Sequence, residues 1–550
     1  MKNYTITYCL LLIFIITSDA QVTQQWVKIY DGPTTGVDIA RSIAVDRFGN
    51  VIVSGESHNG SLSFDYATIK YNLTGTQQWV SRYNSGDNGP DYSRSMGIDY
   101  AGNVYVTGDI YLLSTQADYA TIKYNQSGSQ QWLRTYNSVD SSADRAYSIA
   151  VDSSGISFIT GSSYGSSHGN DIVTIKYSSG GSQLWVQRFN GPSNNSDAGV
   201  QVVIDKSLNA YVAGNVYNPA GSLMDYAVIK YNTSGVQQWV QMYNGAGNGN
   251  DEAASIALDD SGNVYITGYT TSSGSNHDFL TIKYNPAGIF QWARTYNGPP
   301  NGLDEATCIK ADHFGNIFVG GSSTGSGNLD FEVIKYNSAG VQQWVRRYNS
   351  GYTDELNAIA LDKFGNVYVT GNSGSASSST DAVVIRYDSD STLKWLQRYN
   401  GTSNYFDWGL AIAVDTSFNV YVAGQTWVTA QNDNFLTIKY SQPVGIKPIS
   451  SEIPEEFSLS QNFPNPFNPI TKLRFALPPS PSGDLKAGGL VVRLFIYNIL
   501  GREVAALVSE QLNPGTYEVD WDGTNYSSGI YYYKLTAGDI VQTKKMVLLK

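Results

Sequence analysis

Over most of its length the chain alternates hydrophobic and polar residues with a two-residue period, in runs of five to eight residues. Residues 38–84 contain four such runs: SIAVD (42–46), GNVIVSG (49–55), DYATIKYN (65–72) and QQWVSRYN (77–84). They are rich in Val, Ile, Thr, Tyr and Trp, and clusters of Gly, Asn, Asp and Ser separate them. The pattern predicts four strands, A to D, joined by hairpin turns into one small antiparallel sheet.

This unit returns about every 50 residues, a period typical of repeat architectures. Its tryptophan recurs at Trp26, Trp79, Trp132, Trp185, Trp239, Trp292, Trp344 and Trp395. The A strand ends in Asp46, Asp99, Asp152, Asp205, Asp259, Asp312, Asp362 and Asp415. A lone sheet of this size cannot cover both of its faces, so the units must stack. Four-stranded units repeated around an axis form a β-propeller, and the sequence predicts eight blades.

The ends of the repeat region predict how the ring closes. The mature chain begins with a D strand (24–30), and the last unit stops after a C strand (435–440). The N-terminal strand can therefore complete the last blade, which leaves no open sheet edge. We expect a closed eight-bladed propeller of four-stranded antiparallel blades over residues 21–440. The alternative is an open array of sheets.

Residues 1–20 are predicted to be a signal peptide. Lys2 provides the positive start, residues 8–17 form the apolar run, and residues 18–20 form a small-x-small cleavage site. The apolar run is too short to span a membrane in the mature protein, and no later stretch is long enough. We therefore expect an exported, soluble product without a transmembrane segment.

Charge and motifs exclude several functions. The chain has 35 Lys and Arg against 47 Asp and Glu, a formal net charge of −12. A nucleic-acid-binding surface is basic, so this balance argues against nucleic acid as a partner and is more compatible with cations or neutral glycans. The sequence has no G-x-S-x-G, H-E-x-x-H, P-loop or Cys cluster, and it predicts no catalytic residue.

Loop length predicts which rim of the propeller carries function. The A–B and C–D turns are short and uniform, whereas the B–C and D–A connections are long and differ between units. Variable connections on a rigid frame are the usual place for a binding site, so we expect a ligand at the B–C/D–A rim. Aromatic residues on this rim could stack on a glycan or pack under the loops: Trp408, Trp427, Tyr405, Tyr164 and Tyr217.

The same rim carries one aspartate per unit, eight residues before the end of strand A: Asp38, Asp91, Asp144, Asp197, Asp251, Asp304, Asp354 and Asp407. Such a ring could hold Ca²⁺, which takes about six to eight oxygen ligands. Alternatively, each carboxylate accepts hydrogen bonds from backbone N–H groups and braces its own loop. The sequence favours bracing, because every unit has the residue. It predicts no other cofactor.

One position in strand A indicates crowding near the axis. Two residues before the terminal Asp, six of the eight units have Ala or Gly, and Lys310 departs from this pattern. Either Lys310 projects into the central channel or its blade is rotated. The sequence favours the rotated blade.

After residue 440 the repeat ends. Residues 441–456 contain three prolines and no period, so they are predicted to be a linker. Residues 457–550 predict a second all-β domain of six or seven short strands, a small immunoglobulin-like sandwich.

Several motifs of this domain resemble the type A sorting domain of the type IX secretion system of Bacteroidetes-like bacteria. They are N-F-P-N-P-F-N-P (462–469), I-Y-N-I-L-G-R-E-V (496–504), W-D-G (521–523), S-G-I-Y-Y-Y (528–533) and K-K-M-V-L-L-K (544–550). The resemblance implies a sorting signal that includes Asn465, Pro466, Phe467, Asn468, Pro469, Gly501, Arg502, Lys544, Lys545 and Lys550. It also implies the type IX machinery as a partner, with export through the periplasm followed by release or attachment at the outer surface. The repeat region is similar to bacterial β-propeller repeat proteins of the SBBP kind.

Three functions remain open. The first is a secreted or surface-displayed propeller that binds a glycan or a protein at the B–C/D–A rim. The second is a polysaccharide lyase or hydrolase on a propeller scaffold, which needs a carboxylate pair or a Tyr/His/Arg set near the axis. The third is a purely structural surface protein. The absence of a catalytic motif favours the binding protein over the enzyme.

Overall fold

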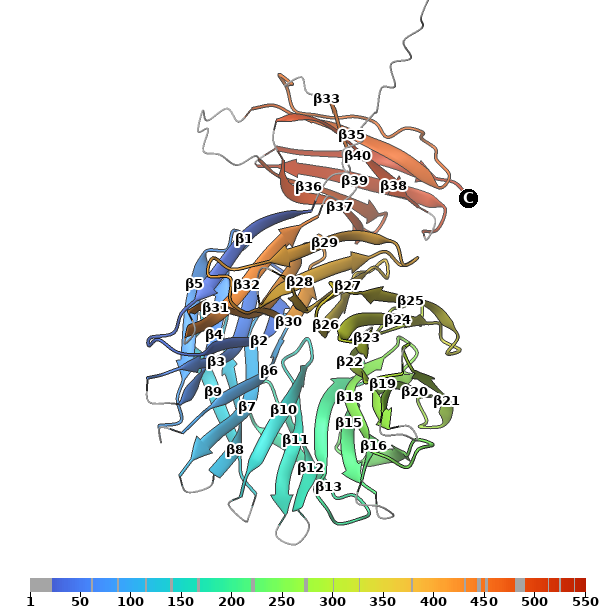
Figure 1. Cartoon of the computed structure of the whole chain (residues 1–550). Coiled ribbons are helices and arrows are strands. Elements are labelled where there is room, and N and C mark those ends of the chain that lie inside the picture. The colour runs from blue at the N-terminus through green and yellow to red at the C-terminus, as the bar shows by residue number, and fades with distance from the viewer. Residues whose placement is uncertain are drawn as a thin grey trace, which may run out of the picture. The chain divides into compact units, whose positions relative to one another are not determined.

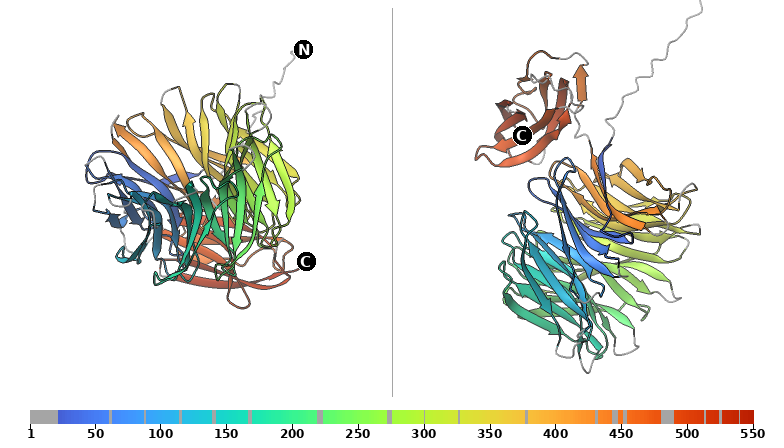
Figure 2. Two further views of the ribbon diagram at one scale, coloured as in Figure 1. Left: turned by 90° about the horizontal axis from the view of Figure 1, so that it is seen from below. Right: turned by 90° about the vertical axis from the view of Figure 1, so that its left-hand side faces the viewer.

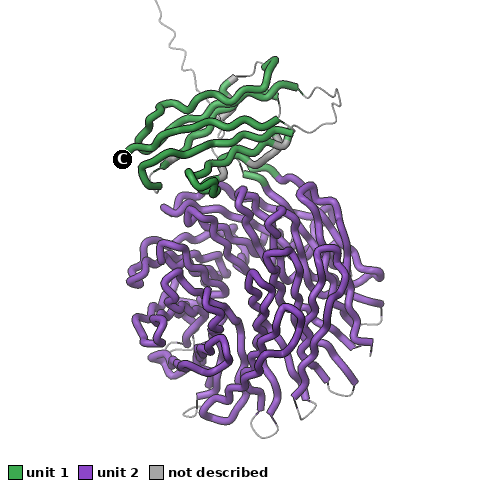
Figure 3. The backbone as a smooth tube through the Cα atoms, turned by 180° about the vertical axis from the view of Figure 1, so that it is seen from behind, with its two compact units in different colours: residues 1–23, 441–550 green, residues 24–440 purple. Residues whose placement is uncertain are grey.

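The computed structural model describes residues 22–550 except 61–62, 87–88, 114–115, 139–141, 166–168, 219–222, 272–275, 300, 326, 377–378, 430–431, 443–446, 451–453, 480–489, 513, 524–525 and 539. The predicted signal peptide, residues 1–20, lies outside the described residues. The described chain is all-β, and none of these residues is in a helix. It divides into a larger unit, Gln24–Tyr440, and a smaller unit that contains Ser441–Lys550 (Figure 3).

In the larger unit the described strands form eight four-stranded sheets (Figure 1). Their first strands, A, are β2 (Asp38–Val45), β6 (Tyr92–Ile98), β10 (Asp144–Val151), β14 (Ala198–Ile204), β18 (Asp251–Leu258), β22 (Asp304–Ala311), β26 (Asp354–Leu361) and β30 (Asp407–Val414). The second strands, B, are β3 (Val51–His58), β7 (Val104–Leu112), β11 (Ser157–Gly165), β15 (Ala210–Tyr217), β19 (Val264–Thr271), β23 (Ile317–Thr324), β27 (Val367–Gly374) and β31 (Val420–Thr429).

The third and fourth strands complete each sheet. The third, C, are β4 (Phe64–Tyr71), β8 (Gln116–Tyr124), β12 (Gly169–Tyr177), β16 (Met224–Tyr231), β20 (His277–Tyr284), β24 (Leu329–Tyr336), β28 (Thr380–Tyr387) and β32 (Asn432–Ser441). The fourth, D, are β5 (Gln77–Tyr83), β9 (Gln130–Tyr136), β13 (Gln183–Phe189), β17 (Gln237–Tyr243), β21 (Phe290–Tyr296), β25 (Gln342–Tyr348), β29 (Leu393–Tyr399) and β1 (Thr23–Tyr30). The last sheet has the order β1-β32-β31-β30, so its fourth strand comes from the N-terminus.

In seven of the eight sheets the D-strand tryptophan bonds to a turn of the next sheet. The indole N–H of Trp79 on β5 donates to the carbonyl of Gln126 in the β8–β9 turn at 2.9 Å. Equivalent bonds of 3.2–3.3 Å run from Trp132, Trp185, Trp239, Trp292 and Trp344 to the turn of the following sheet. The indole also covers a turn glycine with positive φ, as Trp79 covers Gly128 (φ 82°). Each sheet thus buries one face against its neighbour.

The same contact joins the last sheet to the first. Trp26 on β1 donates to the carbonyl of Leu73 in the β4–β5 turn at 3.2 Å. Ala40 and Val51 of the first sheet share a hydrophobic cluster with Tyr421 and Phe435 of the last. Figure 2 shows the sheets of this unit arranged around a centre, with the N-terminal blue strands beside the orange ones.

The smaller unit consists of two four-stranded sheets with one shared core. One sheet has the order β33-β38-β35-β34 and the other β37-β36-β39-β40. Their bounds are β33 (Lys447–Ser450), β34 (Ser458–Leu459), β35 (Ile470–Leu477), β36 (Leu490–Asn498), β37 (Glu503–Leu512), β38 (Gly515–Asp522), β39 (Gly529–Ala537) and β40 (Ile540–Leu548). Phe475 and Trp521 of the first sheet pack with Leu494, Tyr533 and Leu548 of the second.

The predicted linker over residues 441–456 is wrong in part. Residues 447–450 form strand β33, which pairs with β38, and Ser441 onward belongs to the smaller unit. Pro448 suggested irregular chain, but a proline is tolerated in an edge strand, and β33 is the edge of its sheet.

Replacing Gly128 with Ala tests the contact between sheets. The left-handed backbone costs an L-residue about 1–2 kcal/mol, and the new Cβ would lie 2.6 Å from the Trp79 ring, for which overpacking adds about 1–3 kcal/mol. We expect a fall in the urea midpoint of unfolding. Gly86 is the matched control: its φ is also positive (97°), but a Cβ there meets no atom of the described residues within 4 Å. Equal losses in the two variants would contradict the role of the contact.

Candidate functional site: a central cavity

The first strands of all eight sheets line one cavity of about 460 Å³, here called the central cavity. Its lining residues come from the middle of each strand: Ser42, Arg94, Ser95, Met96, Tyr147, Ser148, Ile149, Val200, Gln201, Val202, Ala254, Ser255, Thr307, Cys308, Ile309, Lys310, Asn357, Ala358, Ile359, Leu410, Ala411 and Ile412. The volume is typical of a small-molecule site.

A β-bulge in each first strand shapes the cavity. The register between strands A and B slips at the same place in every sheet, as between Ala40 and Ser42 in β2. The bulged residue lies three positions after the rim aspartate, as Arg41 follows Asp38. A bulge aims its side chain away from the regular pleat. The residues at this position are Arg41, Arg94, Tyr147, Val200, Ala254, Thr307, Asn357 and Leu410, and no two neighbours beyond the first pair are alike.

Two arginines at this position form ion pairs with the second strand of their own sheet. Arg41 pairs with Glu56 at 2.6 Å, and Arg94 pairs with Asp109 at 2.9 Å. Burial raises the pKa of Asp109, and the bond to Arg94 offsets part of that rise. Burial lowers the pKa of Arg94, but Asp109 outweighs burial, so the net pKa is raised.

The five aromatic residues predicted to bind a ligand do not line the central cavity. Trp408 and Trp427 come together through Phe406, whose ring centre lies 6.4 Å from that of Trp408 and 4.8 Å from that of Trp427. Both tryptophans are half-buried, and Trp408 donates to the Thr380 hydroxyl at 3.0 Å. This arrangement resembles packing under the loops.

The other three predicted aromatic residues lie apart from one another along the chain. Tyr164 ends β11, Tyr217 ends β15, and Tyr405 precedes β30. Tyr164 and Tyr405 are exposed, so a ligand could reach them. Their part in binding stays a prediction.

The eight rim aspartates brace the loops that precede the first strands. In seven of them the carboxylate accepts the backbone N–H of the residue six positions earlier, as Asp38 accepts from Gly32 at 2.7 Å. Asp354 accepts from Ser350, four positions earlier, at 2.7 Å. The N–H twenty positions later also donates in several sheets, as His58 does to Asp38 at 3.0 Å.

These carboxyl groups are buried, with exposed fractions of 0–1%. Burial raises the pKa of Asp91, Asp197 and Asp407 to about 6. Among the described residues, no three His, Cys, Asp or Glu side chains gather as a metal site requires. The backbone contacts account for the series, and Ca²⁺ binding stays a prediction.

Sequence reasoning missed the bulged residues, among them Arg94, Tyr147 and Asn357. The signal was present, because seven different residue types occupy this position in the eight units. Its meaning depends on the bulge, which only the strand register reveals.

A second group that the sequence analysis missed is Glu332 on β24, which is fully buried where most sheets have Ala or Val. It pairs with Arg347 at 2.7 Å, and Arg347 also pairs with Asp330 at 3.3 Å. Burial raises the pKa of Glu332 to about 7, and Arg347 offsets part of this rise. Glu332 does not line the central cavity, so we assign it to the buried ion pair that joins β24 and β25 within its own sheet.

The residues of the predicted sorting signal lie in the smaller unit. Phe467 is buried against Trp521, with ring centres 5.2 Å apart, and its N–H donates to the Val547 carbonyl at 3.0 Å. The Asn465 side chain accepts the Val547 N–H at 2.9 Å. The peptide bonds before Pro466 and Pro469 are cis. Phe467, next to Asn468, forms a parallel bridge with Leu548 at the end of β40.

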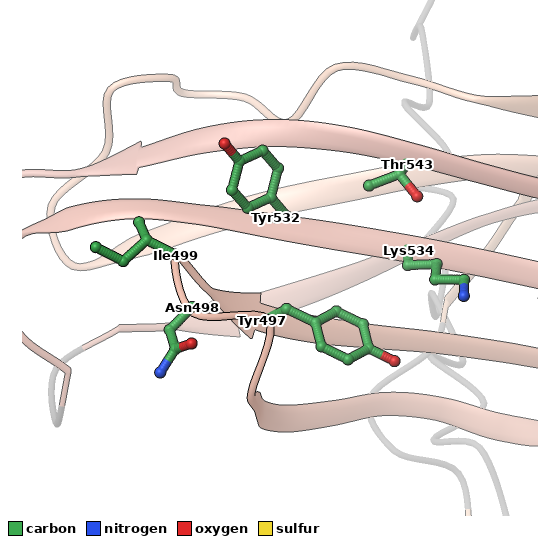
Figure 4. Close-up of a pocket in the computed structure, with 7 residues that line it drawn as sticks. Tyr497, Asn498, Ile499, Tyr532, Lys534 and Thr543 are labelled. Carbon is green, nitrogen blue, oxygen red and sulfur yellow. The ribbon is translucent and has the colours of Figure 1, made fainter.

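The remaining signal residues are on turns and on β40. Gly501, with φ 71°, and Arg502 form a turn whose N–H groups bond to Asn498. The residues Lys544 and Lys545 are on β40, and the Lys550 N–H donates to the Ser528 hydroxyl at 2.9 Å. A pocket of about 300 Å³ lies beside this turn and is lined by Tyr497, Asn498, Ile499, Gly501, Tyr532, Lys534 and Thr543. Figure 4 shows these side chains.

Comparisons with known families agree with this architecture. The sheets define the class: an all-β protein of four-stranded antiparallel propeller blades. Residues 238–274 and 343–377 match the family model of the beta-propeller repeat, and residues 461–549 match that of the secretion system C-terminal sorting domain. The chain therefore carries beta-propeller repeats and ends in a sorting domain of the type IX secretion system, which confirms both predicted resemblances.

The sorting domain implies an interaction with the secretion machinery and a secreted or cell-surface location. None of the described segments forms a helix that is long and apolar enough to span a membrane. No curated protein matches the chain.

Solved structures show likeness of fold only. Sqt1 from Chaetomium thermophilum is 9% identical, covers 76% of this chain and 99% of its own, and has a TM-score of 0.44. The β-propeller domain of the Trilobed protease from Pyrococcus furiosus, described as having an open velcro topology, is 9% identical over 63% of this chain and 93% of its own, with a TM-score of 0.38. Neither likeness carries an argument about function.

Replacing Glu332 with Gln is expected to change how stability depends on pH. Because the folded pKa of about 7 lies above the unfolded value of 4.5, the folded state binds this proton more tightly, and stability falls as pH rises through this window. The loss amounts to at most about 3 kcal/mol. Between pH 5 and pH 8 the free energy of unfolding of the variant, measured in urea, should therefore rise relative to that of the wild type. Gln343→Ala, an exposed change on the neighbouring strand, is the control; parallel pH profiles for Glu332→Gln and the wild type would refute the assignment.

Replacing Phe467 with Ala is expected to impair export. The ring is 2% exposed, and its loss from the core costs about 3–5 kcal/mol, which unfolds much of the smaller unit. The measurement is the fraction of protein in the periplasm against the surface and medium, with a deletion of residues 457–550 as reference. Ile470→Ala, at a side chain that is 50% exposed, is the control. Normal export of Phe467→Ala would show that the buried ring is not needed.

Proposed function

We propose that this protein is a secreted or cell-surface binding protein whose ligand occupies the central cavity of a closed eight-bladed propeller. The observation that supports the proposal is the cavity itself: all eight first strands contribute to its lining, and seven of the eight bulged residues line it. A rigid frame with one variable position is how binding proteins acquire specificity.

Closure of the ring rests on three contacts. Strand β1 completes the last sheet, Trp26 bonds to the turn of the first sheet, and Ala40 packs against Tyr421 across the join. We further propose that the smaller unit is an immunoglobulin-like sandwich. Its two sheets around one core support this assignment.

The ligand enters from the B–C/D–A rim. The bulged residues lie three positions after the rim aspartates, and Lys310 lies further along its strand, next to the last residue of β22. The exposed Tyr164 and Tyr405 belong to the same rim and would extend the contact with a larger glycan or protein.

The alternative is an enzyme that acts on polysaccharides. A glycoside hydrolase needs two carboxyl groups on either side of the bond, and none of the described residues that line the cavity is Asp or Glu. A lyase needs a base beside a cation, and Tyr147 and Arg94 both line the cavity. Formation of an unsaturated product from a polyuronate, lost in Tyr147→Phe, would establish the lyase instead of the binding protein.

Filling the cavity tests the proposal. Ala254 occupies the bulged position of β18, so Ala254→Trp places an indole in the cavity and is expected to weaken binding at least 10-fold. A ligand is first identified by screening glycan arrays and extracellular proteins. Its affinity is then measured by calorimetry on the mature full-length chain. Val236→Trp, on a C–D turn and 58% exposed, is the control.

Equal affinities in the two variants would place the ligand elsewhere. A wild-type protein that binds nothing on any array would contradict the binding function and favour a structural role at the surface.

A further inference from the structure

Lys310 lies in the central cavity, and its sheet is not rotated. It pairs with Phe318 in the register of β22 and β23, as Ala44 pairs with Ile52 and Ala257 with Tyr265 in other sheets. Its side chain is exposed and lines the cavity. Of the two alternatives that the sequence left open, the structure therefore supports the channel lysine.

The charge inside the cavity is positive. Of the described residues that line it, Lys310 and Arg94 are cations and none is a carboxylate. Arg94 is compensated by Asp109. Lys310 makes no ion pair within the described parts of the chain, although the protein as a whole has a net charge of −12.

Polar groups on other first strands that line the cavity leave donors free. The hydroxyls of Ser95 and Ser148 accept the N–H groups of Ile149 (3.3 Å) and Val202 (3.2 Å) in the next sheet, so their own protons remain available to a ligand. The side-chain oxygen of Gln201 accepts two hydrogen bonds from the next sheet, from the Ser255 hydroxyl and from a backbone N–H. Its NH₂ group is left to donate.

We propose that the central cavity binds an anionic sugar, with its carboxylate or sulfate at Lys310. A cation without a partner and several free donors suit an oxyanion, because charge-assisted hydrogen bonds are the stronger ones. The ring of hydroxyl and amide groups suits the hydroxyls of a sugar, and Tyr147 offers an apolar face. About 460 Å³ is enough for a short oligosaccharide. This inference rests on the proposed function, since it names the ligand class of the same cavity.

The test compares a charged sugar with its neutral form. The probes are tri-galacturonate, its methyl ester and a sulfated disaccharide, titrated into the mature full-length protein. We expect the acid to bind about 10-fold or more tightly than the ester, and its affinity to fall with added NaCl. In Lys310→Ala this preference should shrink to about 2-fold or less, while affinity for the ester stays the same.

Lys310→Ala is expected to fold, because Ala is the common residue at this position of the repeat. Lys206→Ala is the matched control, since it removes an exposed lysine in an A–B turn that pairs with Asp260. Unfolding in urea checks the fold of both variants. Binding of the sulfated sugar but not of tri-galacturonate would identify sulfate as the anion and support the inference.

The outcomes separate this inference from the proposed function. Equal binding of acid and ester, or a preference that survives in Lys310→Ala, overturns the anionic ligand, although Ala254→Trp can still block the cavity. A protein ligand that Ala254→Trp excludes and Lys310→Ala does not affect also overturns it and leaves the proposed function standing. If no probe or array ligand binds, both fail.

Discussion

The contact between the D-strand tryptophan and the turn of the next sheet is the interaction on which the structure of the larger unit depends. A four-stranded sheet of this size has no core of its own, so its faces are buried only by its neighbours. The indole N–H fixes the distance between neighbours, because it must reach one turn carbonyl, and the ring fixes the angle by lying over the turn glycine. The same bond from Trp26 to Leu73 shows that the last sheet is spaced from the first in the same way.

This spacing also defines the cavity. The first strand of every sheet faces the centre, so the repeated strands determine the width of the cavity. The residues that differ between the repeats determine its chemistry. The bulge separates the two roles: regular positions of the strand pack against neighbours, and the bulged residue is turned out of the pleat. Arg94 pairs within its own sheet, whereas Thr307 and Asn357 at the same position also bond to the next sheet, to the carbonyls of Leu356 and Gly409 at 2.9 Å.

The strands, their order and the sorting domain could be predicted from the sequence, because each depends on local periodicity, turn residues or motifs. The site could not. Long variable loops drew attention to Trp408 and Trp427, but both residues lie in strands, on β30 and β31, and Phe406 packs with both. The direction of Lys310 depends on strand register, which the periodicity of one strand does not define. Pro448 led to the prediction of a linker for a similar reason. A proline destabilises a central strand but is tolerated in an edge strand, and the sequence does not show which of the two β33 is.

An acidic protein can nevertheless carry a positive cavity, because net charge is a sum and a binding site responds to the groups near it. The eight rim aspartates are buried and held by backbone N–H groups, and Asp109 and Glu56 are held by arginines. The exposed acidic surface acts over about one Debye length, some 8 Å at physiological salt, whereas a ligand in the cavity contacts Lys310 directly. The net charge that favoured cations and neutral glycans as partners therefore describes the surface of this protein. The charge of the central cavity is determined by the few residues that differ from the repeat, above all Lys310.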